Sequence, residues 1–261
     1  MGRFLSALGA GGGEPNIIPT VLMNDSGLFD VDAMNPEGSD ADLPTGRDPF
    51  NAVFLGYRFV IVCWPHMSKA AGIGTKDQPL WRAVVGSADP DAFEIASQAC
   101  ADYQFTQRER RPGLYDTIGH PRGALELLWW EPQAGFMATR TQQMATAMKV
   151  TMENLIAALP KVKDLSGQDV PKLAPFPAVV APGEAVANTS KGGQAWSEFP
   201  IGIWQQSTGE TLAAFEAFKQ WLMGPDNTPE VDAVLKEWNK TTLADNELQD
   251  LQAVSKAKRG G

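Results

Sequence analysis

The hydrophobic pattern is dominated by residues 52–64, the longest run of β-branched and aromatic residues in the chain. Prolines bound the run on both sides, which predicts one long strand. Alternate positions on one side are almost all apolar and are expected in the core. The other side places Arg58 among aromatics such as Phe54. That side is either core beneath a second layer or a surface on which planar groups stack.

Shorter patterns predict the remaining regular elements. Apolar segments indicate further strands at residues 80–85, 123–130 and 196–204. Helical spacing indicates helices at residues 89–101, 139–159, 211–223 and 229–240. The helix at 139–159 has the clearest stripe, and we expect that stripe in the core: Met144, Met148, Met152, Leu155 and Leu159.

Two regions lack such patterns. Residues 1–49 contain a glycine run, scattered prolines and acidic residues, which predicts a flexible arm. Within it, residues 17–23 are compatible with one edge strand, and residues 29–34 with a helical turn or a docked apolar segment. Residues 161–188 resemble a proline-rich connector with one short strand at 178–180, and residues 191–193 resemble a turn.

The order and spacing of these elements bear on the fold class. The strands are irregularly spaced and show no repeated βαβ rhythm. This favours an α+β domain built on a small antiparallel sheet or a partly closed β-barrel, with flanking helices and extended arms. We expect an acidic arm at 1–49, a core domain at 50–225, and a C-terminal helix with a basic tail at 226–261.

The net charge of −9 is unevenly distributed. Residues 1–50 carry −6, residues 51–160 are neutral, and residues 161–261 carry −3. This argues against a simple polycationic nucleic-acid binder but allows a local basic groove with acidic arms that compete for it. No apolar run is long enough to span a bilayer, and no signal peptide is visible, so we expect a cytoplasmic protein without a membrane partner.

Motifs for catalysis or metal binding are weak. A mixed metal site can be drawn from Cys63, His66, Cys100 and His120, but two buried thiols and two loop histidines explain them more simply. The glycine-rich segments at 9–13 and 72–76 do not match a phosphate-binding loop, and no nucleophile elbow occurs. Glu126 is the only acidic residue in the middle of a strand, and we expect it to face solvent. We therefore expect no cofactor and no enzymatic activity.

Aromatic and cationic side chains are the remaining chemical signal. The chain has eight tryptophans, several of which lie near arginines in the sequence. Flat side chains that stack on bases, together with cations that neutralise phosphates, are typical of proteins that bind single-stranded nucleic acid. The alternative is that most of these rings fill the core. The residues expected in a nucleic-acid groove are Arg58, Trp64, Lys69, Lys76, Trp81, Arg82, Tyr103, Phe105, Arg108, Arg110, Arg111 and Tyr115.

The layout of the chain resembles single-stranded-DNA-binding proteins of phages and mobile elements. The resemblance covers residues 50–222 and rests on the order of five segments: 53–59, 108–115, 125–129, 144–159 and 199–204. It implies an OB-like barrel that coats single-stranded DNA in the cytoplasm, or in a host cytoplasm if phage-encoded. It also implies replication or recombination proteins as partners. Family members often place metal-binding cysteines in the insert, where this chain has only Cys100. The chain also ends in a basic rather than an acidic tip.

Two hypotheses from different classes follow. The first is a protein that coats single-stranded DNA non-specifically, in which the acidic arm competes for the groove or contacts a neighbouring copy on the DNA. The second is a structural or assembly protein, such as a virion component, whose arms become ordered on oligomerisation.

Overall fold

A computed structural model of the chain describes residues 18–32, 35–64, 81–86, 120–190, 192–205, 209–225 and 227–238. The chain divides into two compact units. Asn16–Tyr57 and Leu125–Trp238 form the first, called here the main unit. The second includes Arg58–Ala124, of which the structure describes only strand segments.

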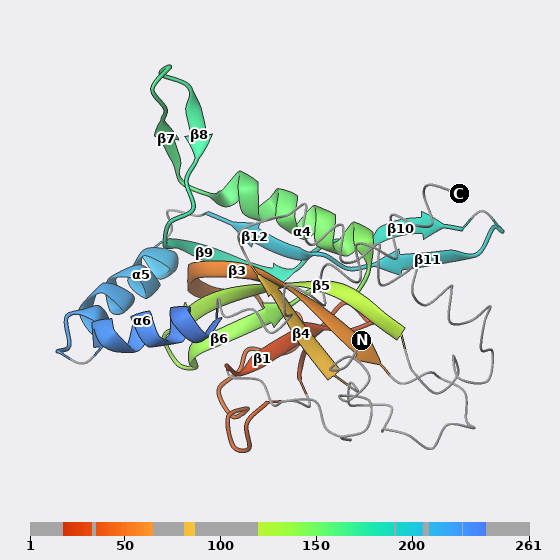
Figure 1. The fold of residues 1–261 in the computed structure, drawn as a ribbon, viewed down its shortest axis with the longest axis horizontal. Coiled ribbons are helices and arrows are strands. Elements are labelled where there is room, and N and C mark those ends of the chain that lie inside the picture. Colours follow the sequence, from red (N-terminus) through yellow and green to blue (C-terminus); the bar gives the residue numbers. More distant parts are fainter. Residues whose placement is uncertain are drawn as a thin grey trace. The chain divides into compact units, whose positions relative to one another are not determined.

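A curled, mixed β-sheet is the central element of the fold (Figure 1). Seven of its strands follow the order β12-β9-β3-β5-β6-β1-β2, and β4 pairs with β3 outside this path. β1 runs parallel to β6, whereas β3 is antiparallel to both β9 and β4. The strands are β1 (Thr20–Met23), β2 (Phe29–Val31), β3 (Phe50–Trp64), β4 (Trp81–Gly86), β5 (His120–Glu131), β6 (Gly135–Arg140), β9 (Phe176–Pro182) and β12 (Ile201–Trp204).

The α+β class is confirmed, but the small antiparallel sheet is wrong, because N-terminal residues join the sheet. Residues expected in a flexible arm form β1 and β2, and β1 lies inside the strand order, not at its edge. Val21, Met23 and Phe29 are buried, so these strands contribute apolar side chains to the core. The apolar surface that they bury offsets the entropy of ordering the segment.

Strand β6 was missed by the sequence pattern. A tight turn joins it to β5: the Glu131 carboxylate accepts hydrogen bonds from the backbone N–H groups of Gln133 and Ala134, at 2.7 and 2.6 Å. Gly135 then adopts a φ of 70°, which a side chain would disfavour. The helix predicted from residue 139 therefore begins later, because residues 139–140 belong to β6.

The long strand β3 buries side chains on both faces in the main unit, although Leu55 and Tyr57 are only half-buried. Phe54 lies on one face, with its ring centroid 5.5 Å from Trp129 and 5.3 Å from Phe176. Val53 lies on the opposite face in a cluster with Trp130 and Phe218. The face left open by the sequence is therefore core in this part of the strand, not a stacking surface.

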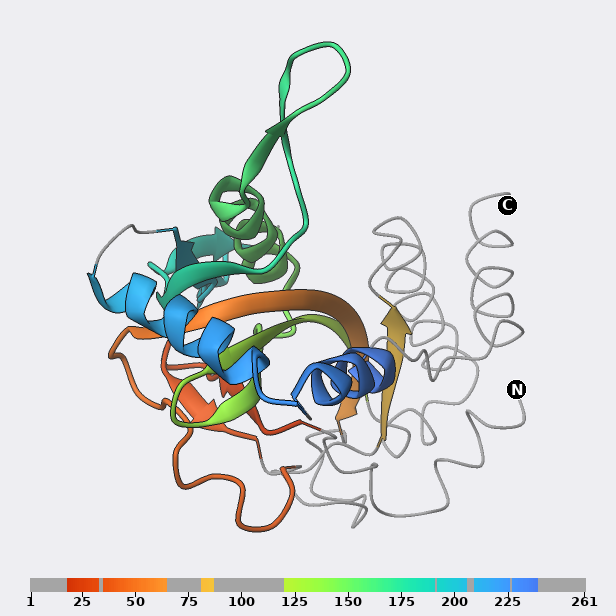
Figure 2. The same cartoon turned by 90° about the vertical axis from the view of Figure 1, so that its left-hand side faces the viewer.

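Two C-terminal helices cover one face of the β5–β6 hairpin (Figure 2). They are α5 (Gly209–Leu222) and α6 (Asn227–Trp238). Trp130 of β5 lies 5.4 Å from Phe218 and 5.9 Å from Trp221 of α5, measured between ring centroids. Trp238 of α6 is buried with Leu128 of β5. Aromatic burial of this kind stabilises the docking of helices on a sheet.

Helix α4 (Ala145–Ala158) covers the free edge of β12. Thr151 Oγ1 accepts a hydrogen bond from the Ile201 N–H at 2.8 Å, and Asn154 Nδ2 donates to the Ile201 carbonyl at 2.9 Å. The buried stripe of α4 is Ala147, Thr151, Leu155 and Ala158. The predicted methionine stripe is therefore largely wrong, since Met148 and Met152 are only half-buried and Met144 precedes the helix.

Two hairpins occupy the region predicted as a connector and a single strand. The first joins β7 (Lys161–Lys163) to β8 (Asp169–Pro171), and the second joins β10 (Val186–Thr189) to β11 (Ala195–Glu198). The strand predicted at 196–204 is split into β11 and β12, with Pro200 between them. No helix in the described ranges combines the length and apolar character needed to cross a lipid bilayer.

Candidate functional site

The residues predicted to bind nucleic acid lie mostly outside the described ranges. Arg58 is described, and it is buried on β3 with 2% of its surface exposed, so its place in an open groove is not supported. Trp64, Trp81 and Arg82 lie on the antiparallel pair β3–β4, where Trp81 is opposite Cys63. This pairing brings the three positions to the same end of the β3–β4 strand pair. The residues outside the described ranges are Lys69, Lys76, Tyr103, Phe105, Arg108, Arg110, Arg111 and Tyr115.

Of the four residues considered as a mixed metal site, two lie in the described ranges and two do not. Cys63 lies on β3 and His120 begins β5, whereas His66 and Cys100 fall outside the described ranges. Within the described ranges, no three His, Cys, Asp or Glu side chains gather as a metal site.

Two exposed tryptophans were not selected from the sequence. Trp196 on β11 is 38% exposed, and its indole N–H donates to Glu198 Oε1 at 3.0 Å. Trp204 on β12 is 46% exposed, and its ring lies across Gly202, where an added Cβ would be 2.5 Å from the indole. The sequence analysis selects as binding residues only tryptophans that have arginines nearby in the chain. These two were passed over because exposure depends on the fold.

Glu198 itself links the second hairpin to α4. Its Oε2 accepts a hydrogen bond at 2.9 Å from the N–H of Ala147, in the first turn of the helix. Met144 at the N-cap position makes no side-chain capping bond. A buried carboxylate from β11 thus supplies the cap that the local sequence lacks.

A groove of about 710 Å³ opens on the main unit beside α5. Asp42, Glu131 and Glu210 contribute acidic groups, and no lysine or arginine is among the lining residues, all of which are described. Thr211 Oγ1 donates to Asn51 Oδ1 at 3.0 Å and holds the start of α5 against β3. The groove therefore suits a cationic or apolar occupant and disfavours a phosphate backbone. Its other lining residues are Ala41, Leu43, Pro44, Phe50, Asn51, Pro132, Gln133, Ala213, Ala214 and Ala217.

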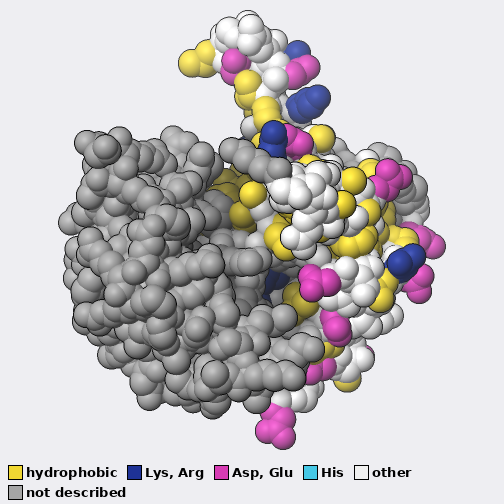
Figure 3. Space-filling view, turned by 90° about the vertical axis from the view of Figure 1, so that its right-hand side faces the viewer, with side chains coloured by type: hydrophobic (Ala, Val, Ile, Leu, Met, Phe, Trp, Pro, Cys, Tyr) yellow, Lys and Arg dark blue, Asp and Glu magenta, His cyan; other side chains and the backbone are white. Residues whose placement is uncertain are grey.

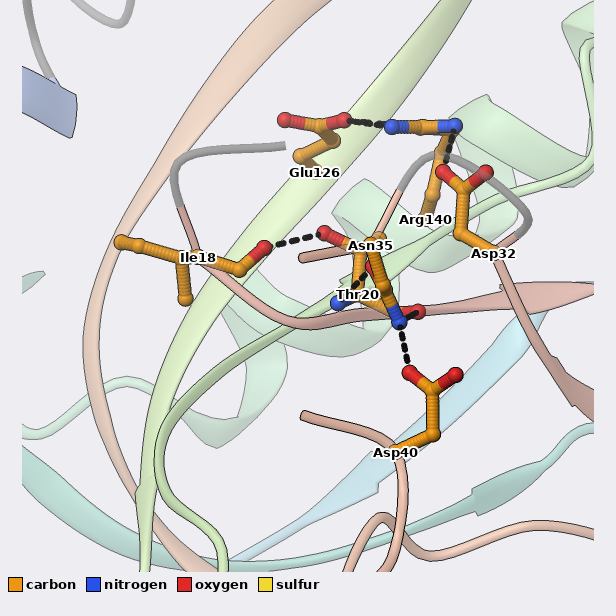
Figure 4. Close-up of polar contacts among 7 residues, drawn as sticks. All are labelled: Ile18, Thr20, Asp32, Asn35, Asp40, Glu126 and Arg140. Carbon is orange, nitrogen blue, oxygen red and sulfur yellow. Dashed lines mark hydrogen bonds and ion pairs between the residues drawn. The ribbon is translucent and has the colours of Figure 1, made fainter. Parts of the chain in front are cut away.

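A buried ion cluster joins the N-terminal strands to the β5–β6 hairpin (Figure 4). Arg140 Nη1 lies 2.5 Å from Asp32 Oδ2, and its Nε donates to Glu126 Oε1 at 2.7 Å. Burial by itself lowers the pKa of Arg140, but the charges of Glu126 and Asp32 raise it above the ordinary value overall. All three side chains are almost fully buried.

The expectation that Glu126 faces solvent is wrong. Arg140 lies directly opposite Glu126 on β6. Asp32, the residue that follows β2, contacts the same arginine. The pattern within one strand could not reveal either partner. Because Arg140 binds both carboxylates inside the protein, the cluster acts as an anchor for the N-terminal strands.

Asn35 makes a second attachment beside this cluster. The Thr20 N–H donates to Asn35 Oδ1 at 2.7 Å, and Asn35 Nδ2 donates to the Thr20 carbonyl at 2.9 Å. Asn35 Nδ2 also lies 3.0 Å from Asp40 Oδ1 (Figure 4). The Asn35 side-chain amide therefore forms the two hydrogen bonds with Thr20 that the backbone of a neighbouring strand would form. These bonds attach the segment after β2 to the sheet.

The β7–β8 hairpin projects away from the sheet (Figures 1 and 2). Every residue of its two strands is exposed except Val170, which is half-buried. Asp164 orders the tip, since its Oδ1 accepts bonds from the N–H groups of Ser166 and Gln168 and from the Ser166 hydroxyl. These bonds, the Ser166 hydroxyl first, hold the pKa of Asp164 below its ordinary value.

The acidic groove, the projecting β7–β8 hairpin and the exposed rings of Trp196 and Trp204 are therefore the surfaces of the main unit that bear on function. Comparison with protein-family models, curated proteins and solved structures found no match to this chain.

Proposed function

We propose that the protein binds single-stranded DNA without sequence preference, by stacking bases on aromatic rings and neutralising phosphates with arginine and lysine. The observation that carries the proposal is the strand order β9-β3-β5-β6. Without β4, which lies in the connection from β3 to β5, it is the Greek-key order, in which a fourth strand returns to lie beside the first of three strands. With β12 as the fifth strand, the arrangement is compatible with an OB-like, partly open barrel.

The open side of this barrel has a physical explanation. Closing it would require β12 to pair with β6, but each of these strands has another neighbour. β6 pairs in parallel with β1, and the Ile201 backbone of β12 bonds to Thr151 and Asn154 of α4. β6 thus has a second strand neighbour, and the Ile201 backbone is hydrogen-bonded without closure.

OB folds bind oligonucleotides with the face of their second and third strands and with the connections between strands 1–2 and 4–5. In this chain, those connections are residues 65–119, in which β4 lies, and residues 183–200. The first contains ten of the predicted binding residues, from Lys69 to Tyr115. The second contains the exposed ring of Trp196. The proposal therefore assigns DNA contact to the aromatic and cationic residues of these two connections.

The main unit also limits where DNA would lie. Helices α5 and α6 cover one face of the β5–β6 hairpin, and the groove beside α5 is acidic. We therefore assign binding to the two connections, not to the sheet face. Trp204, just beyond the second connection, is a further exposed ring available for stacking.

The test is a titration of the full chain with fluorescently labelled oligo-dT at two salt concentrations, followed by anisotropy and tryptophan quenching. The variant R108A/R110A/R111A removes three arginines from the first connection. For a single strand, losing three phosphate contacts is expected to make the salt dependence of log K shallower by about 2. A control variant, K149A/K219A/K236A, removes three exposed helical lysines and should bind as the natural protein does.

Trp196→Ala tests the stacking contribution separately. Loss of one stacked base is worth about 1–3 kcal/mol, which corresponds to binding weaker by about 5-fold to 150-fold. The quenching signal should shrink in parallel. Absence of binding at low salt would refute the proposal.

The second candidate function is assembly into a larger structure. One observation favours it, namely the projecting β7–β8 hairpin, which contributes little to the core of its own chain. Large regular particles that form without nucleic acid, seen by electron microscopy at rising protein concentration, would support this function over DNA coating.

A further inference from the structure

The β7–β8 hairpin has the features of a docking element. An isolated two-stranded hairpin is marginally stable in water, and this one has exposed strands. It nevertheless has an ordered tip, because Asp164 bonds to the backbone on the far side of the turn. Leu165, next to Asp164, is fully exposed at that tip. An ordered turn presents Leu165 without the entropic cost of fixing a flexible loop on binding, which favours a role in contacting a partner.

The charge of the hairpin stem is the second observation. Lys161, Lys163 and Lys172 are exposed along the stem and its exit. Asp164 and Asp169 oppose these three lysines, so the stem and tip together carry a net charge of +1. Asp169 pairs with Lys163 at 2.8 Å, and Figure 3 shows basic and acidic side chains together on the projecting hairpin. Val162 and Leu173 add exposed apolar surface beside these lysines.

The groove beside α5 is complementary to the hairpin in both charge and polarity. Its acidic residues face no lysine or arginine among the lining residues. Its apolar part is hollowed because α5 presents small side chains there, Ala213, Ala214 and Ala217. Asp42 and Glu210 are exposed and thus able to meet incoming ammonium groups. The same chain therefore carries a cationic projection with an apolar tip and an acidic hollow with an apolar wall.

We propose that the β7–β8 hairpin of one copy docks in the acidic groove of a second copy. Leu165 contacts the alanines of α5, and the stem lysines lie near Asp42 and Glu210 of the neighbour. The contact joins two different surfaces, so it is heterologous and repeats head to tail into a ring or an open chain. The inference does not depend on the proposed DNA binding, although such a repeat would allow cooperative coating of a strand.

Nucleic acid is a weaker candidate as the occupant of this hairpin. Its strands and tip contain no aromatic ring on which a base could stack. A contact formed by one hairpin is also small for a protein interface. We therefore expect self-association with a dissociation constant on the order of tens of micromolar.

The experiment is sedimentation velocity on the full chain over a concentration series from about 5 to 300 µM, which brackets the expected dissociation constant. The natural protein should show a rising sedimentation coefficient. Leu165→Ser at the tip and Ala213→Trp in the groove should each abolish the rise. Matched controls elsewhere are Met223→Ser, an exposed apolar residue after α5, and Ala233→Trp, an exposed alanine of α6. Both controls should associate as the natural protein does.

Charge reversal identifies the two partner surfaces. K161E/K172E on the hairpin and D42K/E210K in the groove should each prevent self-association, and the four changes combined in one chain should restore it. A mixture of the two separate variants retains one natural hairpin and one natural groove. The reversed hairpin of one variant also complements the reversed groove of the other, so both contacts can form and the mixture should associate head to tail as the natural protein does. Thermal unfolding of each variant checks that the fold is retained.

Several outcomes would overturn the inference. The natural protein could remain monomeric over the whole concentration range, or Leu165→Ser could associate normally. The combined charge reversal could also fail to restore association. If K161E/K172E lost oligo-dT binding while its self-association stayed unchanged, the hairpin would bind nucleic acid and not a second copy of the chain. Because association is measured without DNA, its failure is distinguishable from failure of the proposed DNA binding.

Discussion

Replacing Arg140 with methionine tests the buried ion cluster most directly. Arg140 donates to Asp32 and Glu126, and both carboxylates are at least 99% buried. Methionine fills a similar apolar volume but offers no donor. The variant therefore loses the cation that both carboxylates contact while leaving the acids in a low-dielectric interior.

The magnitude follows from this geometry. Removing one partner from a buried ion pair costs about 3–5 kcal/mol, because the remaining charge is no longer compensated. Total stabilities are about 5–15 kcal/mol, so the loss is a large share of the free energy of unfolding. For a domain of about 150 residues, it corresponds to a fall in Tm of roughly 6–20 °C.

The assay is urea unfolding followed by tryptophan fluorescence, supported by thermal melts. Lys149→Met is the matched control, since Lys149 is an exposed cation whose ion pair with Glu153 spans 3.9 Å. Such surface pairs contribute about 0–1 kcal/mol. The triple variant D32L/E126L/R140M should recover part of the loss, because it removes the buried charges together with their partner.

A cost below about 1 kcal/mol for Arg140→Met would contradict the account, since a buried partner cannot be removed so cheaply. So would a triple variant less stable than the single one by several kcal/mol. Either result would mean that water reaches the cluster, or that the N-terminal strands are not held to the sheet through it.

Three further changes test other parts of the main unit. Gly27→Ala should destabilise the protein more than Gly46→Ala. Both glycines have positive φ, but only at Gly27 does an aromatic ring occupy the Cβ position, so unfolding free energies should differ by more than about 1 kcal/mol. Glu198→Ala should cost about 1–3 kcal/mol in urea unfolding by uncapping α4, whereas exposed Glu153→Ala should cost little. Because the folded-state pKa of Asp164 lies below the ordinary value of an aspartate, its hairpin-tip bonds should persist while free aspartates protonate and be lost only at lower pH, as the Asp164 carboxyl itself protonates. NMR amide shifts of the tip report this, and a transition at the pH where free aspartates protonate would contradict it.

Local pattern predicted the elements whose signal lies within one segment. The strand expected at 52–64 is β3, the strand at 123–130 is β5, and the helices at 211–223 and 229–240 are α5 and α6. In each case, the apolar periodicity of the segment matches the period of the element it forms. Binding residues in the 65–119 connection stay a prediction, because they lie outside the described ranges.

Elements that depend on distant partners were not predictable in this way. β1 and β2 are short and flanked by glycine, proline and acidic residues, so their composition resembles an arm. They become strands because β1 pairs with β6, more than 100 residues away in the chain, and because Arg140 binds Asp32. The β7–β8 hairpin was likewise hidden, since strands with two exposed faces carry no alternating pattern.

The sequence by itself determined the α+β class, the long central strand and the C-terminal helices, because apolar periodicity is a property of a single segment. Only the tertiary structure decided which faces are covered. It buried Arg58 and Glu126, exposed Trp196 and Trp204, and set a cationic hairpin and an acidic groove on one unit. Burial and charge complementarity are properties of pairs of segments, and only the tertiary fold determines which segments lie together.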